Sequence, residues 1–279
     1  MLKFLVLLRR SVWRTFQHDG FAIAKAAAYS GLLTLFPAFL VLASVLEASD
    51  TTPLFFVQIY YAIGKVFPQG TSGTVLGYFD LRNQKPTHVI FSASLVMLTA
   101  ASGVMVSLMD GFRRAYGIQT NPWGFWYERA MAFLLVPLSL VPLAFATVLV
   151  AFGNQVENWL SLQVWYELRP LVFLTWRIGR WIISALTSVS VIGLIYHMSI
   201  PRTQSWRRVL PGASLATVMW FGSTLAFGWY VTRYANYNVI YGSLGAAIAL
   251  LVWLYLVSIV VLIGAEFNAL IFPKREMEI

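Results

Sequence analysis

Two charged residues stand inside the apolar runs of this sequence, and they are the first candidates for chemistry. Lys25 lies near the start of the first run, and Glu266 lies near the end of the last run, YGSLGAAIALLVWLYLVSIVVLIGAEFN at 241–268. If these runs cross a bilayer, a charge near the centre would cost at least about 2.5–3.5 kcal/mol. We therefore expect Glu266 to have a cationic partner. Lys25 is the first candidate, and the alternatives are Arg113, Arg114, Arg207 and Arg208.

The favoured role of Glu266 is that of a structural ion pair, because it stands only about 6 Å inside a boundary near residue 270. Coupling to a substrate or a proton is the second interpretation, and a lipid-exposed edge is the third. Snorkelling to the membrane surface is easy for Lys25, whose stem is long. The shorter Glu266 needs its partner more.

The remaining inventory of chemical groups is poor. His18, His88 and His197 have no metal-ligand spacing, cysteine is absent, and the sequence has no phosphate-binding or nucleophile motif. The eleven acidic residues are spread along the chain, where a nuclease would need clustered carboxylates. The arginines also lack the interleaved aromatics of RNA readers. We expect no enzyme, no metal, no cofactor and no nucleic-acid partner.

Composition identifies the class of protein that must position these residues. Hydrophobic residues make up 59% of the 279 residues and charged residues 11%, whereas a soluble domain has about 25% charged residues. Several apolar runs reach the roughly 20 residues that span a bilayer. Residues 246–263 are apolar on every face, which excludes the alternation of a β-barrel. The sequence predicts an all-α, polytopic membrane protein.

Six spans form one predicted membrane domain over 1–279. They lie near 22–46, 88–109, 129–152, 181–198, 209–231 and 244–271. The segment 1–20 has an apolar face opposite Lys3, Arg10 and Arg14, which predicts an interfacial amphipathic helix. Asp19 is the predicted N-cap of the first span. Residues 54–67 predict a second surface helix on the periplasmic side, with a re-entrant element as the alternative.

The distribution of lysine and arginine predicts the orientation. With the N-terminus inside, the internal segments carry twelve of these residues and the external segments seven, over a greater length. Both termini are therefore expected in the cytoplasm. Arg177 and Arg180, beside the fourth span, dissent from this pattern. The net charge of +9 is interpreted as loop charges facing anionic lipid headgroups.

Small residues and prolines indicate how the spans pack. Alanine, glycine and serine gather in the first, second, fifth and sixth spans, where they let backbones approach in lipid. Pro37 lies inside the first span, and Pro137 and Pro142 lie inside the third. Each proline removes a backbone hydrogen bond. Such breaks are static kinks in most helices, but they also build transporter binding sites.

Three stretches carry a resemblance to a known family. AAAYSGLLTLFP at 26–37, RRVLPGASLATVMW at 207–220 and YNVIYGSLGAAIALLVWLYLVSIVVLIGAEFNA at 237–269 resemble the YihY/BrkB family of bacterial inner-membrane proteins. DGFRRAYG at 110–117 is a weaker match. The resemblance implies six spans, cytoplasmic termini and a place in the bacterial inner membrane. The family's members are treated as transporters, with suggested links to envelope lipids or cation exchange, and the residues do not support its older ribonuclease label.

Three functions follow as hypotheses. The first is a transporter of lipids or lipid-linked amphiphiles, whose phosphate headgroup would meet Arg113, Arg114, Arg207 and Arg208, while Tyr241, Gly242 and Gly245 give the last span a flexible start. The second is a cation/proton exchanger using Glu266. The third is a scaffold that binds partner proteins through its surface helices. Membrane lipids are the expected partners, and an oligomer is compatible with the sequence.

Overall fold

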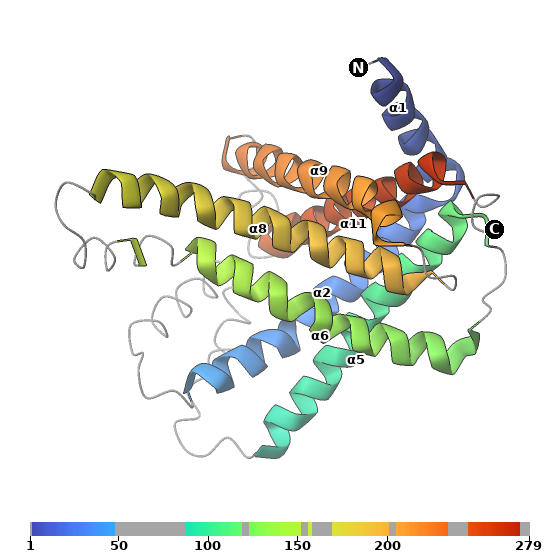
Figure 1. Ribbon diagram of the computed structural model, residues 1–279. Helices are drawn as coiled ribbons and strands as arrows, with labels where there is room; N and C mark the ends of the chain where they lie inside the picture. The colour runs from blue at the N-terminus through green and yellow to red at the C-terminus, as the bar shows by residue number, and fades with distance from the viewer. Residues whose placement is uncertain are drawn as a thin grey trace. The chain divides into compact units, whose positions relative to one another are not determined.

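The computed structural model describes residues 2–47, 87–118, 123–151, 156–157, 169–200, 205–233 and 245–273 (Figure 1). Over these residues the protein is helical and has no strand. Its labelled helices are α1 (Leu2–Gln17), α2 (Gly20–Glu47), α5 (Thr87–Ala115), α6 (Gly124–Ala151), α8 (Arg169–Ser199), α9 (Trp206–Arg233) and α11 (Gly245–Ile271). The predicted all-α membrane class is confirmed.

Five of these helices are long and apolar enough to cross a membrane: α5, α6, α8, α9 and α11. They match five of the six predicted spans. The first predicted span falls on α2, whose described apolar stretch covers Gly20–Leu35 and is shorter than a span. The count of six is therefore not confirmed, and 54–67, the predicted surface or re-entrant helix, lies outside the described residues.

The helix that contains the fourth predicted span begins about three helical turns before the predicted start of that span. This helix, α8, begins at Arg169 rather than near 181, so Arg177 and Arg180 lie within the helix and not in a loop. Arg177 Nη2 lies 3.4 Å from Glu157 Oε1, which gives this cation a partner beside the helix. Loop-charge counting assumes that such residues are outside, and here that assumption fails. The orientation of the termini stays a prediction.

The described chain divides into two compact units. Unit 1 contains residues 1–18, 112–219 and 261–279, and unit 2 contains residues 19–111 and 220–260. Helices α5, α9 and α11 contribute residues to both units. No finding tests the prediction of one membrane domain over 1–279.

Unit 2 shows the close helix packing that small residues predict. A Cβ placed on Gly103 of α5 would lie 2.9 Å from Ser30 Oγ of α2, and one placed on Gly31 would lie 3.3 Å from Leu254 of α11. Ala24 and Ala27 of α2 are fully or almost fully buried. The first, second and sixth predicted spans thus approach one another through small residues.

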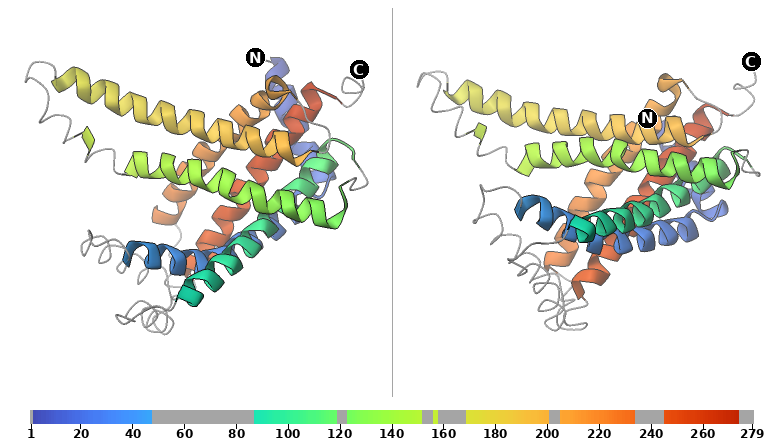
Figure 2. Two further views of the ribbon diagram at one scale, coloured as in Figure 1. Left: turned by 60° about the horizontal axis from the view of Figure 1, so that its bottom comes forward. Right: turned by 90° about the horizontal axis from the view of Figure 1, so that it is seen from below.

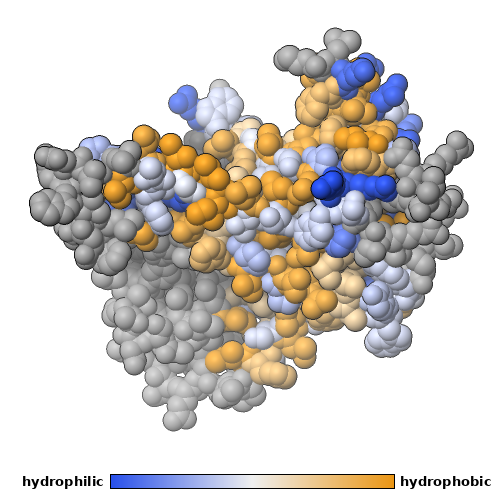
Figure 3. Space-filling model, in the orientation of Figure 1, coloured by the Kyte–Doolittle hydropathy of each residue, from blue (hydrophilic) through white to orange (hydrophobic). Residues whose placement is uncertain are grey.

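In unit 1, α6 and α8 run antiparallel and side by side (Figures 1 and 2). Hydrophobic side chains predominate on the visible face of α8, as expected for a surface in contact with lipid (Figure 3). Leu174, Ile178 and Leu186 of α8 are all exposed. A helix that exposes such residues over its length would be insoluble in water but stable in a bilayer.

Helix α1 is amphipathic, as its sequence predicts. Leu5, Trp13 and Phe16 are exposed, whereas Ser11 and Thr15 are buried and their hydroxyls donate to backbone carbonyls of α1 itself. The helix therefore packs inward through a small, internally satisfied edge. Its exposed apolar face suits a membrane surface.

Candidate functional site

Two prolines inside α6 define the first feature of the candidate site. Pro137 and Pro142 both lie inside this helix, as predicted. Proline has no backbone N–H, so Pro142 cannot donate to the carbonyl of Leu138. Beside this break unit 1 has a groove of about 420 Å³, with Leu138 and Pro142 in its wall.

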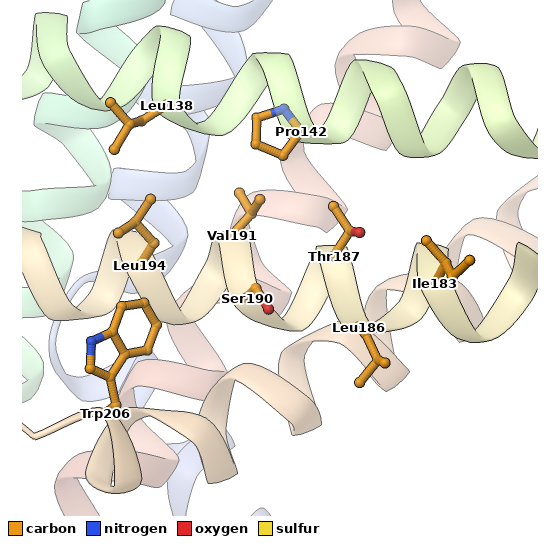
Figure 4. A pocket seen from close by; sticks show the side chains of 9 residues that line it. All are labelled: Leu138, Pro142, Ile183, Leu186, Thr187, Ser190, Val191, Leu194 and Trp206. Carbon is orange, nitrogen blue, oxygen red and sulfur yellow. The ribbon is translucent and has the colours of Figure 1, made fainter.

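The groove is built mainly by α8. Figure 4 shows Thr187 and Val191 facing α6, with Leu138 and Pro142 opposite and Trp206 at the start of α9. The remaining lining residues are Ile183, Leu186, Ser190 and Leu194. Leu186, one of the lining residues, is 62% exposed, which shows that the groove opens on the outside of the helices. We call this set of nine residues the α6–α8 groove.

Trp206 is held in place at one side of the groove. Its ring stacks on His197 with 5.1 Å between centroids and an interplanar angle of 22°. A Cβ on Gly193 would lie 3.6 Å from the indole, an ordinary van der Waals distance, so α8 packs closely against the tryptophan at this position. A rigid aromatic wall is a common part of apolar ligand sites.

The polar chemistry of unit 1 lies elsewhere, in a set of buried side chains that we call the polar core. Its members are His18, Arg113, Glu128, Tyr196, Glu266 and Asn268, all buried except His18. Each makes at least one hydrogen bond within unit 1.

Glu266 pairs with His18, a partner that was not among the sequence candidates. Glu266 Oε1 lies 2.5 Å from His18 Nδ1, and the glutamate side chain is only 3% exposed. Lys25 is exposed on α2. His18 follows α1 directly, so the segment expected only to rest on the membrane also supplies the partner of the carboxylate. The structure thus gives the carboxylate a hydrogen-bonded histidine.

Arg113, predicted to face a lipid headgroup, is instead buried in an ion pair. Its Nη1 donates to Glu128 Oε1 at 2.5 Å, and the two side chains are 9% and 11% exposed. Arg114 and Arg207 are exposed, as a basic rim requires. Arg208 lies over the Phe272 ring, 6.0 Å from its centroid. The four arginines therefore do not form one set with a shared role.

Asn268 of α11 forms hydrogen bonds with α9 where a proline interrupts the backbone bonding of that helix. Pro211 interrupts the backbone donors of α9, and the next residue, Gly212, donates its N–H to Asn268 Oδ1 at 2.6 Å. Asn268 Nδ2 donates in turn to the Val209 carbonyl at 2.9 Å. The side chain thus satisfies one donor and one acceptor that are buried between helices.

Gly264, in the GAE motif, allows this approach. A Cβ added there would lie 2.5 Å from Tyr196 Oη and 2.6 Å from the Gly212 carbonyl oxygen. The Tyr196 hydroxyl donates to the Val261 carbonyl at 2.5 Å. Gly264 thus lets α8 and α9 approach α11 closely beside Glu266.

The other predicted site residues lie at separate positions along the helices. Asp19 directly precedes α2 and its carbonyl accepts from Ala22 and Ile23, as an N-cap carbonyl does, although its φ of 58° is left-handed. Pro37 is buried inside α2, and Gly245 is buried at the start of α11. Tyr241 and Gly242 lie outside the described residues.

Sequence reasoning missed His18 as a partner, Glu128, Tyr196 and Asn268. An available signal was the N in GAEFN, since an asparagine in an apolar span needs hydrogen-bond partners. Among the described residues, no three histidine, aspartate or glutamate side chains gather as a metal site would require.

Comparison with known proteins agrees with the family resemblance that the sequence motifs carry. The profile of the family described as Virulence factor BrkB matches residues 12–278. The ribonuclease-like protein YfkH of Bacillus subtilis (strain 168) is 28% identical over 262 residues, covering 93% of each chain. A UPF0761 membrane protein of Tolumonas auensis is 27% identical, covering 92% of this chain and 82% of its own. No solved structure matches.

Proposed function

The chain belongs to the Virulence factor BrkB family, and we propose that this member transports lipids or lipid-linked amphiphiles, with the α6–α8 groove holding the apolar chain of the transported molecule. The observation that carries the proposal is an apolar groove, open on the outside of the helices, beside a proline break. Its volume of about 420 Å³ falls within the about 300–1,000 Å³ typical of ligand sites.

The groove also offers a few polar groups to an amphiphile. The hydroxyls of Thr187 and Ser190 belong to its lining, and the Leu138 carbonyl lacks the donor that Pro142 would otherwise provide. In a bilayer these groups would orient a glycerol ester or a similar weakly polar linkage. The acyl chain would lie against leucine, isoleucine and valine side chains.

The proposal includes the expected setting. Both termini would face the bacterial cytoplasm, and the exposed arginines at 114 and 207 would meet anionic headgroups there. Twelve lysines and arginines fall in the predicted internal segments and seven in the predicted external segments, and this difference supports the orientation.

Proteoliposomes test the proposal directly. Fluorescent phospholipid placed in one leaflet should redistribute faster with the wild-type protein than in protein-free vesicles. Leu186→Trp, which fills the groove, should slow redistribution at least fivefold. Leu174→Trp is the matched control on α8, since Leu174 is similarly exposed but outside the groove lining. Equal rates with wild-type protein and with empty vesicles would contradict transport of phospholipids.

A second candidate is cation or proton exchange through Glu266. The observation that favours it is the second carboxylate oxygen, Oε2, which is buried and has no hydrogen-bond partner among the described residues. A proton or a cation could occupy that position. If Glu266→Gln leaves cation-driven proton flux in vesicles unchanged, this alternative fails.

A further inference from the structure

A second cavity in unit 1 has a different chemistry from the groove. It measures about 240 Å³ and lies where α1, α5 and α11 end. Arg14, His18 and Tyr116 line it, together with Gly117, Ala115, Ala269 and Pro273. Among the described residues, the lining contains a permanent cation and an imidazole but no carboxylate. This set of residues is the α1 pocket.

Arg14 has donors to spare in this pocket. It stands one helical turn before His18, so both side chains lie on the same face of α1. Within the part of the chain that the structure describes, no hydrogen bond holds its guanidinium, whose five N–H groups suit oxyanions. The Arg14 guanidinium also lies close enough to Glu266 to interact with it electrostatically.

The hydrogen bond between His18 and Glu266 fixes the orientation of the imidazole in the pocket lining. Glu266 Oε1 lies 2.5 Å from Nδ1, and hydrogen-bond logic assigns a proton to that nitrogen when the glutamate is ionised. Nε2 is then the nitrogen that can serve the pocket. In that tautomer Nε2 carries a lone pair, which can accept a hydrogen bond from the P–OH group of a monoprotonated phosphate.

The carbonyls at the helix ends around the pocket are capped, which reduces their attraction for a cation. Three carboxyl ends carry partial negative charge, which alone would attract cations. However, near the pocket the carbonyls of Arg14, Arg113, Arg114 and Asn268 accept bonds from the N–H groups that follow each helix. At α5 the bonds from Gly117 and Ile118 form a Schellman cap, with Gly117 at a φ of 66°.

We propose that the α1 pocket binds a phosphate-type anion through the Arg14 guanidinium and His18 Nε2, with Glu266 acting as a positioning residue for His18. The volume admits one phosphate group with a small substituent, not a lipid tail. The anion could come from a lipid headgroup or from free phosphate in the aqueous phase. This inference does not rest on transport by the groove.

Protection of His18 provides a test on the unmodified protein. Diethylpyrocarbonate modifies accessible imidazole nitrogens, and mass spectrometry of peptides reads modification of His18 and His197 separately. Inorganic phosphate should slow modification of His18 in a saturable way and leave His197 unaffected. In nanodiscs, phosphatidylglycerol should protect His18 more than phosphatidylcholine if the headgroup is the source. If neither inorganic phosphate nor phosphatidylglycerol protects His18, the proposal is overturned.

Matched arginine variants provide the second measurement. Arg14→Gln should weaken phosphate or phosphatidylglycerol protection at least tenfold, whereas Arg10→Gln, one turn earlier and exposed, should change it less than twofold. Glu266→Gln should weaken it several-fold while leaving residual binding. Equal protection in Arg14→Gln and Arg10→Gln would overturn the assignment, as would protection by a monovalent cation at constant phosphate.

Discussion

The α6–α8 groove and the polar core belong to the same unit but follow opposite rules. The groove is apolar, exposed and bordered by a helix with missing backbone bonds. The polar core is buried except at His18, and each of its side chains makes at least one hydrogen bond to another member or to backbone. In lipid, an exposed apolar surface costs nothing, whereas a buried polar group needs its partner. The contrast separates a region that can accommodate a guest from one that fixes the helices.

The largest effect is expected where a buried charge loses its partner. Arg113→Gln leaves Glu128 buried without its cation, which costs about 3–5 kcal/mol of unfolding free energy. Arg114→Gln changes the exposed neighbour and should stay within about 0.5 kcal/mol. Reversible unfolding in mixed detergent measures both. Equal stability of the two variants would remove Arg113 from the polar core and return it to the basic rim.

A smaller loss is expected at the helix contact of the GAE motif. Gly264→Ala forces a methyl group against Tyr196 and the Gly212 carbonyl, which should cost about 1–3 kcal/mol. Gly222→Ala is the control, because a Cβ there meets nothing within 4 Å among the described residues. That variant should be neutral or gain up to about 1 kcal/mol from helix propensity. Thermal unfolding of the two purified variants would decide, and an unchanged Gly264→Ala would show that α9 and α11 do not touch there.

The smallest stability effect is expected in the groove. Leu186→Ala removes a side chain that is 62% exposed, so unfolding free energy should change by about 0.5 kcal/mol or less. The same detergent unfolding assay measures it. A loss above about 2 kcal/mol would mean that Leu186 is packed against protein, and the groove would then be part of the core.

The sequence predicted helices better than partners, and particular residues show why. Apolar length located α5, α6, α9 and α11 within about five residues at each end, apart from a six-residue shift at the end of α5. It placed the start of the fourth span about three turns after the start of α8, because Arg177 and Arg180 look like loop residues until Glu157 supplies a partner for Arg177. Charge and depth indicated that Glu266 needed a base. Choosing His18 over Lys25 required the rotation of each helix, which hydropathy does not encode.

The groove itself was only half predictable. Pro142 indicated a break, and transporters use such breaks, but the opposite wall depends on which face of α8 meets α6. Thr187, Val191 and Trp206 are ordinary residues for an apolar span, and their spacing carries no signal for a ligand. Their role follows from the packing of α8 and from the stacking of Trp206 on His197.

Native mass spectrometry of the detergent-purified protein tests most directly whether the groove holds an amphiphile. The wild-type protein and Leu174→Trp should retain lipid-sized adducts after extensive delipidation, because Leu174 lies outside the groove lining. Leu186→Trp should lose at least four-fifths of that adduct while keeping the wild-type unfolding free energy. Equal retention by Leu186→Trp and Leu174→Trp, or no adduct on the wild-type protein, would contradict the α6–α8 groove as the binding site.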